Sequence, residues 1–377
     1  MNLDIYTLRP INEYSKEHII HNFLGGIKEY GDLIDKETND ILGSTIDYKL
    51  SNALNPFRVL LDARSNRGNQ EPQPIRKLQC IDGNQYDLLS GGKPQISRPF
   101  VEMIDEDGTI RIKGVARSFP EMKNLLKRVS REKGFSLEDV INSSTVHKDN
   151  IPSITIPMEL GGPDFDRAIA KIACNFLAAN NKEQFLNKKF DEIRDYVYKG
   201  NNSEAKRYVY YIPYHVSIST KSRLGDLDHL VLVRSDPDSD NVVALVCLYG
   251  NLNYLVLLGE NSKLTTPLSY RVDQFGKSDR INHEHDLDIG IPNSKKVISA
   301  NNKRILQCMK KQVSYIVGKG IKKQEDEWTN VMLHECISEV FGEPNGSPIT
   351  KEQISRISII ISERYVEWLV RRGCLSE

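Results

Sequence analysis

The sequence predicts an α+β protein, in which helices and antiparallel strands occupy separate stretches of the chain. Three observations support this class. Short runs of β-branched and aromatic residues, each bounded by Gly, Asp, Asn or Ser, follow one another over residues 208–258. Apolar residues recur with helical spacing over residues 164–197 and 304–371. The 377 residues are enough to bury a large core without disulfide or metal staples.

The charge balance and the cysteine pattern limit the classes of function. Lys and Arg number 51, as do Asp and Glu, so a nucleic acid must be bound by local patches and not by a global positive field. The six cysteines form no CxxC pair, so we expect reduced thiols. The apolar runs are too short to span a bilayer and the N-terminus lacks a signal-peptide pattern, which predicts a cytoplasmic protein without a membrane partner.

A small N-terminal unit and a larger remainder can be distinguished along the chain. Residues 1–62 contain short extended segments, a Gly-Gly loop and a helical pattern over residues 37–61. Residues 63–77 are rich in Asn, Gln, Pro and Arg and lack apolar periodicity, which predicts a linker or exposed loop. Residues 78–377 are predicted to form a larger α+β region whose role the sequence does not indicate.

Within the larger region the predicted elements follow in order. Short strands over residues 78–113 precede a helix over residues 120–133. Three further blocks come after them: helices over residues 164–197, an antiparallel meander over residues 208–258 and helices over residues 304–371.

The N-terminal unit contains the residue types that phosphodiester hydrolysis requires. Glu17 and His18 are adjacent at the end of an extended stretch, and they can act together only if the chain bends there, because successive strand residues point to opposite faces. Asn39, Gly43 and Asp47 recur every four residues, so a helix would align them in one stripe. A histidine can accept a proton near neutral pH, and two carboxylates can hold one Mg²⁺.

Each of these residues also has a simpler interpretation. Glu17 and His18 could be a surface pair at a strand end, Asn39 a helix cap and Asp47 a solvated helix carboxylate. A second cluster, residues 282–288, contains two histidines and three acidic residues and is also a metal-site candidate. We interpret it as a solvated loop in which these residues cluster by chance.

The pattern EHII-x₃-LGG, followed by N-x-x-L-G-S-x-x-D, resembles the HNH family of ββα-metal endonucleases. The resemblance covers residues 4–50, and both halves match that family in order and spacing. It implies that Glu17 and Asp47 bind a metal ion, that His18 is the general base and that Asn39 positions it. The implied cofactor is Mg²⁺ or Mn²⁺, and the implied activity is hydrolysis of DNA to 5′-phosphate and 3′-hydroxyl ends.

The sequence also departs from the family pattern. Members of this branch carry two CxxC pairs that bind a structural zinc, whereas here the corresponding residues are Asp4 and Thr7, and Asp35 and Thr38. Such oxygen donors are poor ligands for tetrahedral zinc, so no structural zinc is expected and the residues could hydrogen-bond to one another instead. His21 stands where the family usually has proline, and is either an additional ligand or a part of the loop.

A local basic patch over residues 111–133 is the best candidate for nucleic-acid contact, with eight basic and two acidic residues. Lys123, Lys127 and Arg131 recur every four residues, so a helix would place them on one face. A solvated helix face is the alternative. The predicted contacts are Arg117, Lys123, Lys127, Arg128 and Arg131.

These features together predict a metal-dependent HNH-like endonuclease that acts on DNA, with RNA not excluded. Analogy with HNH proteins that carry long extensions suggests a role in bacterial defence or restriction. The larger region would serve recognition, dimerisation or control, so a homodimer and a partner protein are both compatible. The alternative is a non-catalytic nucleic-acid-binding or regulatory protein that contains a degenerate HNH unit. The loss of the zinc-binding cysteines supports this alternative.

Overall fold

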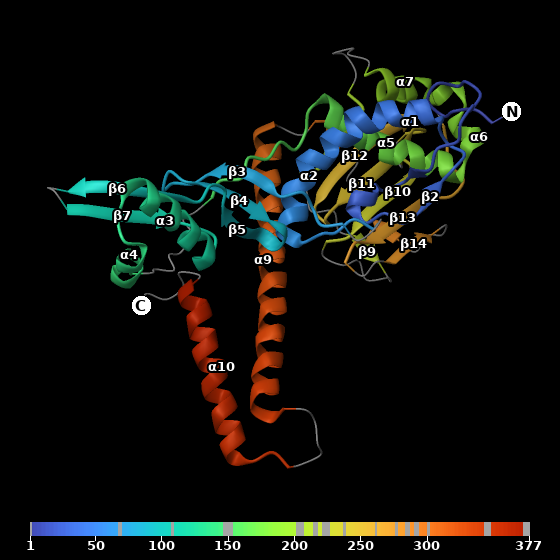
Figure 1. Cartoon of the computed structure of the whole chain (residues 1–377). Coiled ribbons are helices and arrows are strands. Elements are labelled where there is room, and N and C mark those ends of the chain that lie inside the picture. The colour runs from blue at the N-terminus through green and yellow to red at the C-terminus, as the bar shows by residue number, and fades with distance from the viewer. Residues whose placement is uncertain are drawn as a thin grey trace. The chain divides into compact units, whose positions relative to one another are not determined.

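The computed structural model divides the chain into two compact units, each described by itself below (Figure 1). The first unit comprises Met1–Gln73 and Pro157–Gly320, and the second comprises Pro74–Ile156 and Ile321–Glu377. The structure describes residues 2–66, 70–106, 109–145, 154–200, 207–213, 218–220, 227–236, 239–260, 262–275, 278–282, 287–289, 294–299, 302–342 and 348–371.

The fold class is α+β, as the sequence predicts. The strand pairings of the described residues are antiparallel, and long helices occupy the C-terminal part of the chain. In the part of the chain that the structure describes, no helix is both long and apolar enough to cross a membrane.

A six-stranded antiparallel sheet forms the centre of the first unit, in the order β14-β13-β10-β11-β12-β8. Of the meander predicted over residues 208–258, the consecutive strands β10, β11 and β12 pair in sequence order as expected, but the first strand, β8, does not. β8 precedes them in the sequence but pairs with β12, and β13 and β14 extend the opposite edge. The bounds are β8 Val209–Tyr211, β10 His229–Ser235, β11 Val242–Leu248, β12 Leu252–Gly259, β13 Leu268–Asp273 and β14 Ser278–Asn282, while β9 Ile218–Thr220 pairs separately with β15 Leu287–Ile289.

Both faces of this sheet are covered, which explains the uninterrupted apolar runs of its central strands. Val231 and Val233 of β10 belong to the main core together with residues of α5 (Pro163–Asn180). Leu230 and Leu232 point to the opposite face, where Val297 of the short helix α8 (Ser294–Ile298) joins their cluster.

Helix α5 is the central helix of the first unit, because it contributes to the main core along its whole length. Pro163 occupies its first turn, where the missing N–H of proline is not needed. Its buried residues are apolar except for Lys171 and Asn175, one helical turn apart, and Asn175 is as deeply buried as its apolar neighbours. The helices α6 (Lys182–Phe185) and α7 (Asp191–Lys199) follow it.

The N-terminal segment has the predicted order of two strands and a helix. The strands β1 (Glu17–His18) and β2 (Glu29–Tyr30) pair with each other. Apolar residues that flank these strands, such as Ile19 and Ile20, are buried in the same cluster as α5, as are those of the following helices. Residues 1–62 therefore share the core of the first unit. The helical bounds are α1 Lys36–Leu42, a π-helical turn Gly43–Asp47 and α2 Tyr48–Leu61.

The second unit contains two small sheets and a helical hairpin. The hairpin consists of α10 (Lys351–Arg371) and the part of α9 (Asn302–Phe341) from Ile321 onward, since α9 begins in the first unit. The aromatic rings of Trp328 and Trp368 stack at 4.9 Å between these two helices, and Arg364 pairs with carboxylates of α9. The remaining bounds are β3 Ile75–Gln79, β4 Gln85–Leu89, β5 Lys93–Ile96, β6 Phe100–Glu106, β7 Thr109–Val115, α3 Phe119–Lys133 and α4 Leu137–Ser143.

A fully buried histidine in the main sheet should make the protein sensitive to acid. The backbone N–H of Tyr249 donates to Nδ1 of His229, so Nε2 carries the proton and donates to Gln274 Oε1 at 3.2 Å. Burial lowers the pKa of His229 to about 4, against a partly opposing effect of the Gln274 hydrogen bond. The unfolded chain therefore binds more protons than the folded chain between pH 6.5 and about pH 4.

We therefore expect stability to be lost as the pH falls through this window. Between pH 7 and pH 4 the wild type should lose about 3 kcal/mol more of its free energy of unfolding than a His229→Gln variant does. Urea unfolding of both proteins at several pH values measures this difference. Equal losses for the two proteins would show that His229 does not titrate as its burial implies.

Candidate metal centre

The Gly-Gly loop turns the chain immediately after Glu17 and His18. Glu17 lies opposite Tyr30 and His18 opposite Glu29 in the β1–β2 pair, and the backbone N–H of Gly26 then donates to the carbonyl of His21. A methyl group on Gly26 would lie 1.7 Å from the carbonyl oxygen of Ile20. Only glycine allows this close approach of the two backbone segments.

Replacing Gly26 with alanine should therefore strongly destabilise the first unit. We expect a loss of about 3 kcal/mol in the free energy of unfolding, because backbone atoms and not a flexible side chain would have to move. Gly43→Ala is the matched control, since a methyl group there meets nothing within 4 Å and the backbone is already helical. Urea unfolding of both variants provides the comparison, and similar stabilities would contradict the steric argument.

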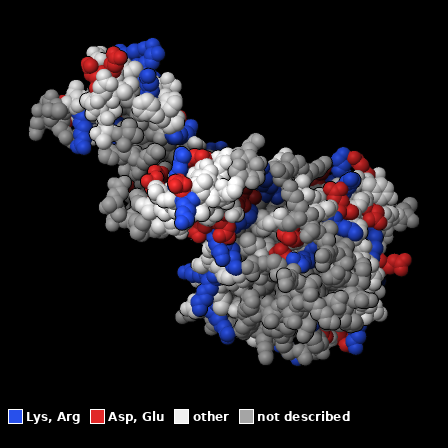
Figure 2. All heavy atoms as spheres, turned by 90° about the horizontal axis from the view of Figure 1, so that it is seen from below, with Lys and Arg blue, Asp and Glu red and all other residues white. Residues whose placement is uncertain are grey.

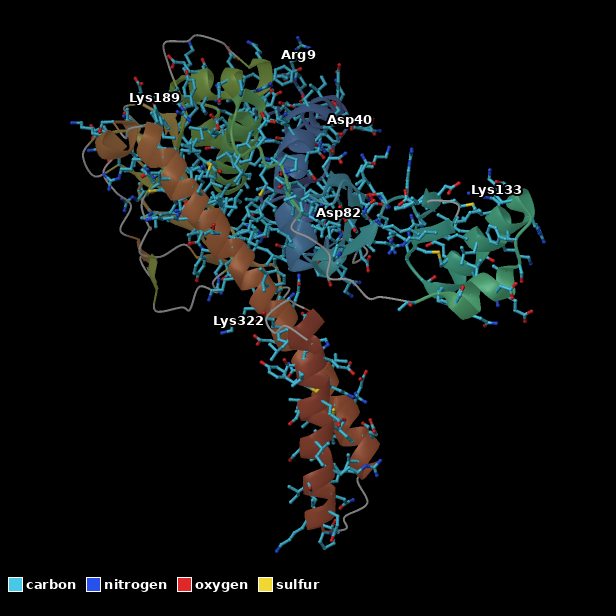
Figure 3. All side chains as sticks on the ribbon, turned by 90° about the vertical axis from the view of Figure 1, so that its left-hand side faces the viewer. Arg9, Asp40, Asp82, Lys133, Lys189 and Lys322 are labelled. Carbon is cyan, nitrogen blue, oxygen red and sulfur yellow. The ribbon has the colours of Figure 1, made fainter. Side chains whose placement is uncertain are left out.

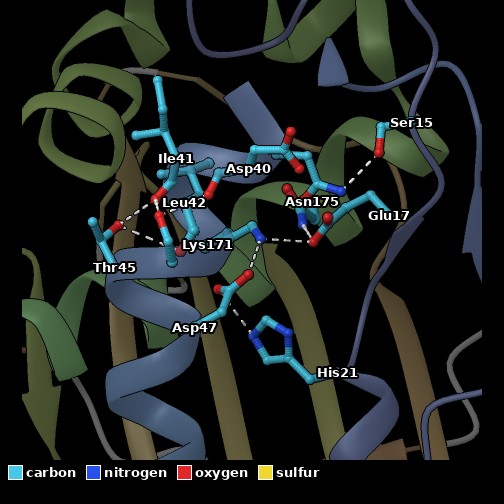
Figure 4. A network of polar contacts seen from close by, with 12 residues as sticks. Ser15, Glu17, His21, Asp40, Ile41, Leu42, Thr45, Asp47, Lys171 and Asn175 are labelled. Atoms are coloured by element: carbon cyan, nitrogen blue, oxygen red, sulfur yellow. Dashed lines mark hydrogen bonds and ion pairs between the residues drawn. The ribbon is translucent and has the colours of Figure 1, made fainter. Parts of the chain in front are cut away.

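A π-helical turn between α1 and α2 carries Asp47 at its end. The hydroxyl group of Ser44 donates to the carbonyl of Asp40 at 2.8 Å, and that of Thr45 donates to the carbonyl of Ile41 at 2.7 Å. Two backbone carbonyls beside the widened turn thus accept hydrogen bonds from side chains. Turns of this kind are frequent at functional sites because they redirect a side chain. Here Asp47 is directed toward β1 and α5 (Figure 4).

A buried lysine joins the two carboxylates that the sequence suggests as metal ligands (Figure 4). The ammonium of Lys171 lies 2.9 Å from Glu17 Oε1 and 2.6 Å from Asp47 Oδ2, and its side chain is 0% exposed. The amide of Asn175 donates to the same oxygen of Glu17 at 2.9 Å, and the hydroxyl of Tyr6 donates to Asn175 Oδ1 at 2.7 Å. Glu17 itself is only 4% exposed.

His21 forms the other side of the cluster. Its Nε2 faces Asp47 Oδ1 at 3.5 Å, and among the described residues neither atom has a hydrogen-bond partner, although both are buried. The ring of Phe23 stacks on the imidazole at 5.2 Å and helps to hold its orientation. Ligand atoms of Glu17, His21 and Asp47 all lie within 4.8 Å of one another.

This geometry fits a divalent metal ion. Two ligand atoms about 2.1 Å from one ion, at an angle of about 90° to 110°, are about 3.0 to 3.4 Å apart. The 3.5 Å between His21 Nε2 and Asp47 Oδ1 is close to that range. Buried polar atoms that lack partners are costly, and a shared ion would satisfy both. The donor set of imidazole and carboxylate is one that divalent ions accept.

The electrostatic environment keeps His21 neutral and Lys171 charged. Burial lowers the pKa of His21, and the neighbouring charge of Asp47 opposes this shift only in part. Burial by itself would lower the pKa of Lys171, but the charges of Glu17 and Asp47 outweigh it and raise that pKa above its ordinary value. A neutral imidazole is the form that binds a metal ion.

His18 lies on the same pocket with a carboxylate partner of its own. Its Nε2 is 3.3 Å from Glu29 Oε1, which comes from the partner strand β2. The amide of Asn39 donates to Ser15 Oγ at 2.7 Å. The pocket has a volume of about 420 Å³ and brings together the four residues that the sequence suggested for catalysis and metal binding. Its lining residues are Lys16, Glu17, His18, His21, Asn22, Phe23, Asn39, Gly43, Asp47, Tyr48 and Ser51.

Asp4 and Asp35, two of the residues that the sequence resemblance aligns with family cysteines, are hydrogen-bonded carboxylates. Asp4 accepts the backbone N–H groups of Tyr6 and Thr7 through Oδ1 and that of Asp35 through Oδ2, at 2.8 to 2.9 Å. Asp35 in turn accepts the backbone N–H of Asn12 at 2.7 Å and caps α1. The two loops are therefore linked through carboxylates and backbone amides.

Sequence reasoning did not find Lys171, Asn175 or Glu29. The apolar spacing over residues 164–197 predicts a helix, but that pattern does not single out its polar residues. The available signal was a lysine and an asparagine four residues apart within an otherwise apolar helix, since one turn places both on the same face. Glu29 carries no such signal, because it is one acidic residue in a polar loop.

The predicted basic patch lies in the second unit, on and before α3. Lys123, Lys127, Arg128 and Arg131 are exposed, whereas the guanidinium of Arg117 donates to the backbone carbonyls of residues 96 and 97. Lys133 ends this helix, as Figure 3 shows. In the face drawn in Figure 2, basic and acidic side chains are intermingled.

The second metal-site candidate from the sequence, residues 282–288, has no side chain that the structure describes. Residues 283–286 lie outside the described residues altogether. The candidate therefore adds nothing to the site in the first unit.

Comparison of the chain with protein-family models, with curated proteins and with solved structures found no match. The evidence on function therefore consists of the pocket and of the sequence pattern of residues 4–50.

Proposed function

We propose that this protein is a metal-dependent endonuclease of the HNH type, which hydrolyses phosphodiester bonds in DNA. One observation carries the proposal. Glu17, His21 and Asp47 place ligand atoms within 4.8 Å of one another in a pocket that His18 and Asn39 also line. The sequence pattern had suggested four of these five residues for this chemistry.

His18 is the general base of the proposed reaction. It takes a proton from the attacking water, the new bond forms between the water oxygen and phosphorus, and the bond to the 3′ oxygen breaks. The departing 3′ oxygen takes up a proton from solvent and His18 releases its own to solvent, which leaves 5′-phosphate and 3′-hydroxyl ends. Glu29 orients the imidazole of His18 and stabilises its protonated form, since it lies 3.3 Å from Nε2.

Glu17, His21 and Asp47 would hold the metal ion. A divalent ion bound there supplies a positive charge that stabilises the additional negative charge on phosphate in the transition state. An imidazole in the donor set favours a first-row transition ion, so Mn²⁺ matches the site better than Mg²⁺. Asn39 donates to Ser15 and thereby fixes the loop that leads into β1.

The exposed residues Lys123, Lys127, Arg128 and Arg131 are proposed phosphate contacts, with Arg117 holding the preceding loop. We place the protein in the cytoplasm, in bacterial defence or restriction, with RNA as a further substrate to be tested. A homodimer and a partner protein are both compatible with the second unit.

Cleavage of supercoiled plasmid by the purified full chain tests this function. We expect nicked and linear products with Mn²⁺, less product with Mg²⁺ and none with EDTA. DNA ligase should reseal the nicks, because their ends are 5′ phosphate and 3′ hydroxyl. A labelled RNA strand in parallel tests the second substrate. A folded protein that cleaves neither substrate with any metal would refute the proposal.

The second candidate is a non-catalytic nucleic-acid-binding or regulatory protein on a degenerate HNH unit. One observation favours it: the ammonium of Lys171 already neutralises part of the charge of Glu17 and Asp47. On this account the protein binds DNA with an affinity that falls steeply with salt. DNA binding with no cleavage and no Mn²⁺ binding would establish this candidate over the first.

A further inference from the structure

We propose that Lys171 is a positioning residue that acts as a built-in cation of the metal centre. It holds Glu17 and Asp47 together before a metal ion arrives and leaves room for one divalent ion on the side of His21. This inference rests on the proposed metal-dependent function and adds a role for a residue whose side chain is 0% exposed and pairs with Glu17 and Asp47.

The contacts of the ammonium determine which oxygens it occupies. Lys171 is bound to one oxygen of each carboxylate, Glu17 Oε1 at 2.9 Å and Asp47 Oδ2 at 2.6 Å. The second oxygen of Asp47 faces His21 and has no hydrogen-bond partner among the described residues. The carboxylate of Asp47 therefore bridges two positions, one filled by the ammonium and one suited to a metal ion.

The surroundings of Glu17 are fixed in the same way. The hydroxyl of Tyr6 donates to Asn175 Oδ1, which leaves the amide nitrogen of Asn175 to donate to Glu17 Oε1. Lys171 and Asn175 both come from α5, whose backbone is held by the main core. The carboxylate is thus positioned by a rigid helix and not by the loop that carries it.

The charges explain why this arrangement suits a single divalent ion. Glu17 and Asp47 carry two negative charges and Lys171 carries one positive charge, so these three side chains have a net charge of −1. Without the ammonium, two buried carboxylates would repel each other and the folded protein would be destabilised. A metal ion could then offset that repulsion, so removal of Lys171 should make stability dependent on the metal.

A Lys171→Met variant of the full chain tests this inference, with thermal unfolding in EDTA and in Mn²⁺ and with calorimetric titration of Mn²⁺. In EDTA the Tm of the variant should be about 10 °C below that of the wild type. Mn²⁺ should restore at least half of this loss, and should raise the Tm of the variant by more than it raises that of the wild type, because the variant binds the ion more tightly. The variant should bind Mn²⁺ at least about tenfold more tightly, because a neighbouring positive charge has been removed.

Two further variants separate charge from packing. Arg194→Met removes another buried cation of the first unit, one that pairs with Asp191, and should lower the Tm without rescue by Mn²⁺. A Lys171→Met and Glu17→Gln double variant keeps the net charge at −1, so its Tm in EDTA should be close to that of the wild type. If Lys171→Met alone does not fold, the Tm of this double variant still tests the inference.

The outcomes distinguish the inference from the proposed function. If the wild type binds Mn²⁺ but the Lys171→Met variant shows neither rescue nor tighter binding, the role of Lys171 is refuted and the proposed function stands. A double variant as unstable as the single variant would likewise attribute the loss to packing. If neither protein binds Mn²⁺, the metal centre and the inference fail together.

Discussion

Replacing His18 with alanine is expected to lower the rate of Mn²⁺-dependent plasmid cleavage by about 10² to 10⁴-fold, the usual contribution of a positioned general base. The loss should appear in kcat and leave DNA binding unchanged, because His18 does not belong to the basic patch. Its partner Glu29, on the adjacent strand, orients His18 but does not take the proton itself. A Glu29→Gln variant should therefore retain part of the activity.

The matched control is His334→Ala, which removes an exposed histidine of α9 and should leave the cleavage rate unchanged. Steady-state cleavage rates, measured at several pH values, compare these proteins. An unaltered rate in His18→Ala would assign the base to another residue.

Replacing Asp47 with asparagine is expected to weaken Mn²⁺ binding by at least about 100-fold, with a parallel loss of cleavage. The change keeps the shape of the side chain but removes the charge that faces His21 and the partner of Lys171. Asp40→Asn is the control, since Asp40 is an exposed residue of the neighbouring helix α1, labelled in Figure 3.

Calorimetric titration of Mn²⁺ into the three proteins measures this effect, and circular dichroism shows whether Asp47→Asn is folded. Equal affinities for the wild type and Asp47→Asn would place the metal ion elsewhere. If Asp40→Asn also lost affinity for Mn²⁺, the effect of Asp47→Asn would come from the negative charge near the site and not from a bond between Asp47 and the metal ion.

Much of the fold could be predicted because its signals are local. The α+β class, the meander of β10 to β12 and the C-terminal helices follow from residue periodicity, and they are confirmed. The edge position of β8 could not be predicted, because it pairs with β12 across more than forty residues of chain. The shared core of residues 1–62 and α5 is also a long-range property, which no local pattern contains.

The candidate site divides in the same way between local and long-range signals. Glu17, His18, Asn39 and Asp47 belong to one continuous stretch, and the structure places all four around one pocket. Lys171 comes from a helix more than a hundred residues later, and its role depends on how α5 packs against that stretch. Only the tertiary structure therefore shows that Lys171 is a buried cation between the carboxylates of Glu17 and Asp47.

The measurement that tests the metal centre most directly is anomalous X-ray scattering from crystals of the full chain soaked in Mn²⁺. We predict a single manganese peak within about 2.3 Å of Asp47 Oδ1 and His21 Nε2, with Lys171 still bound to the other oxygen of Asp47. No manganese peak in that position at saturating Mn²⁺ would contradict the metal centre and favour the degenerate unit.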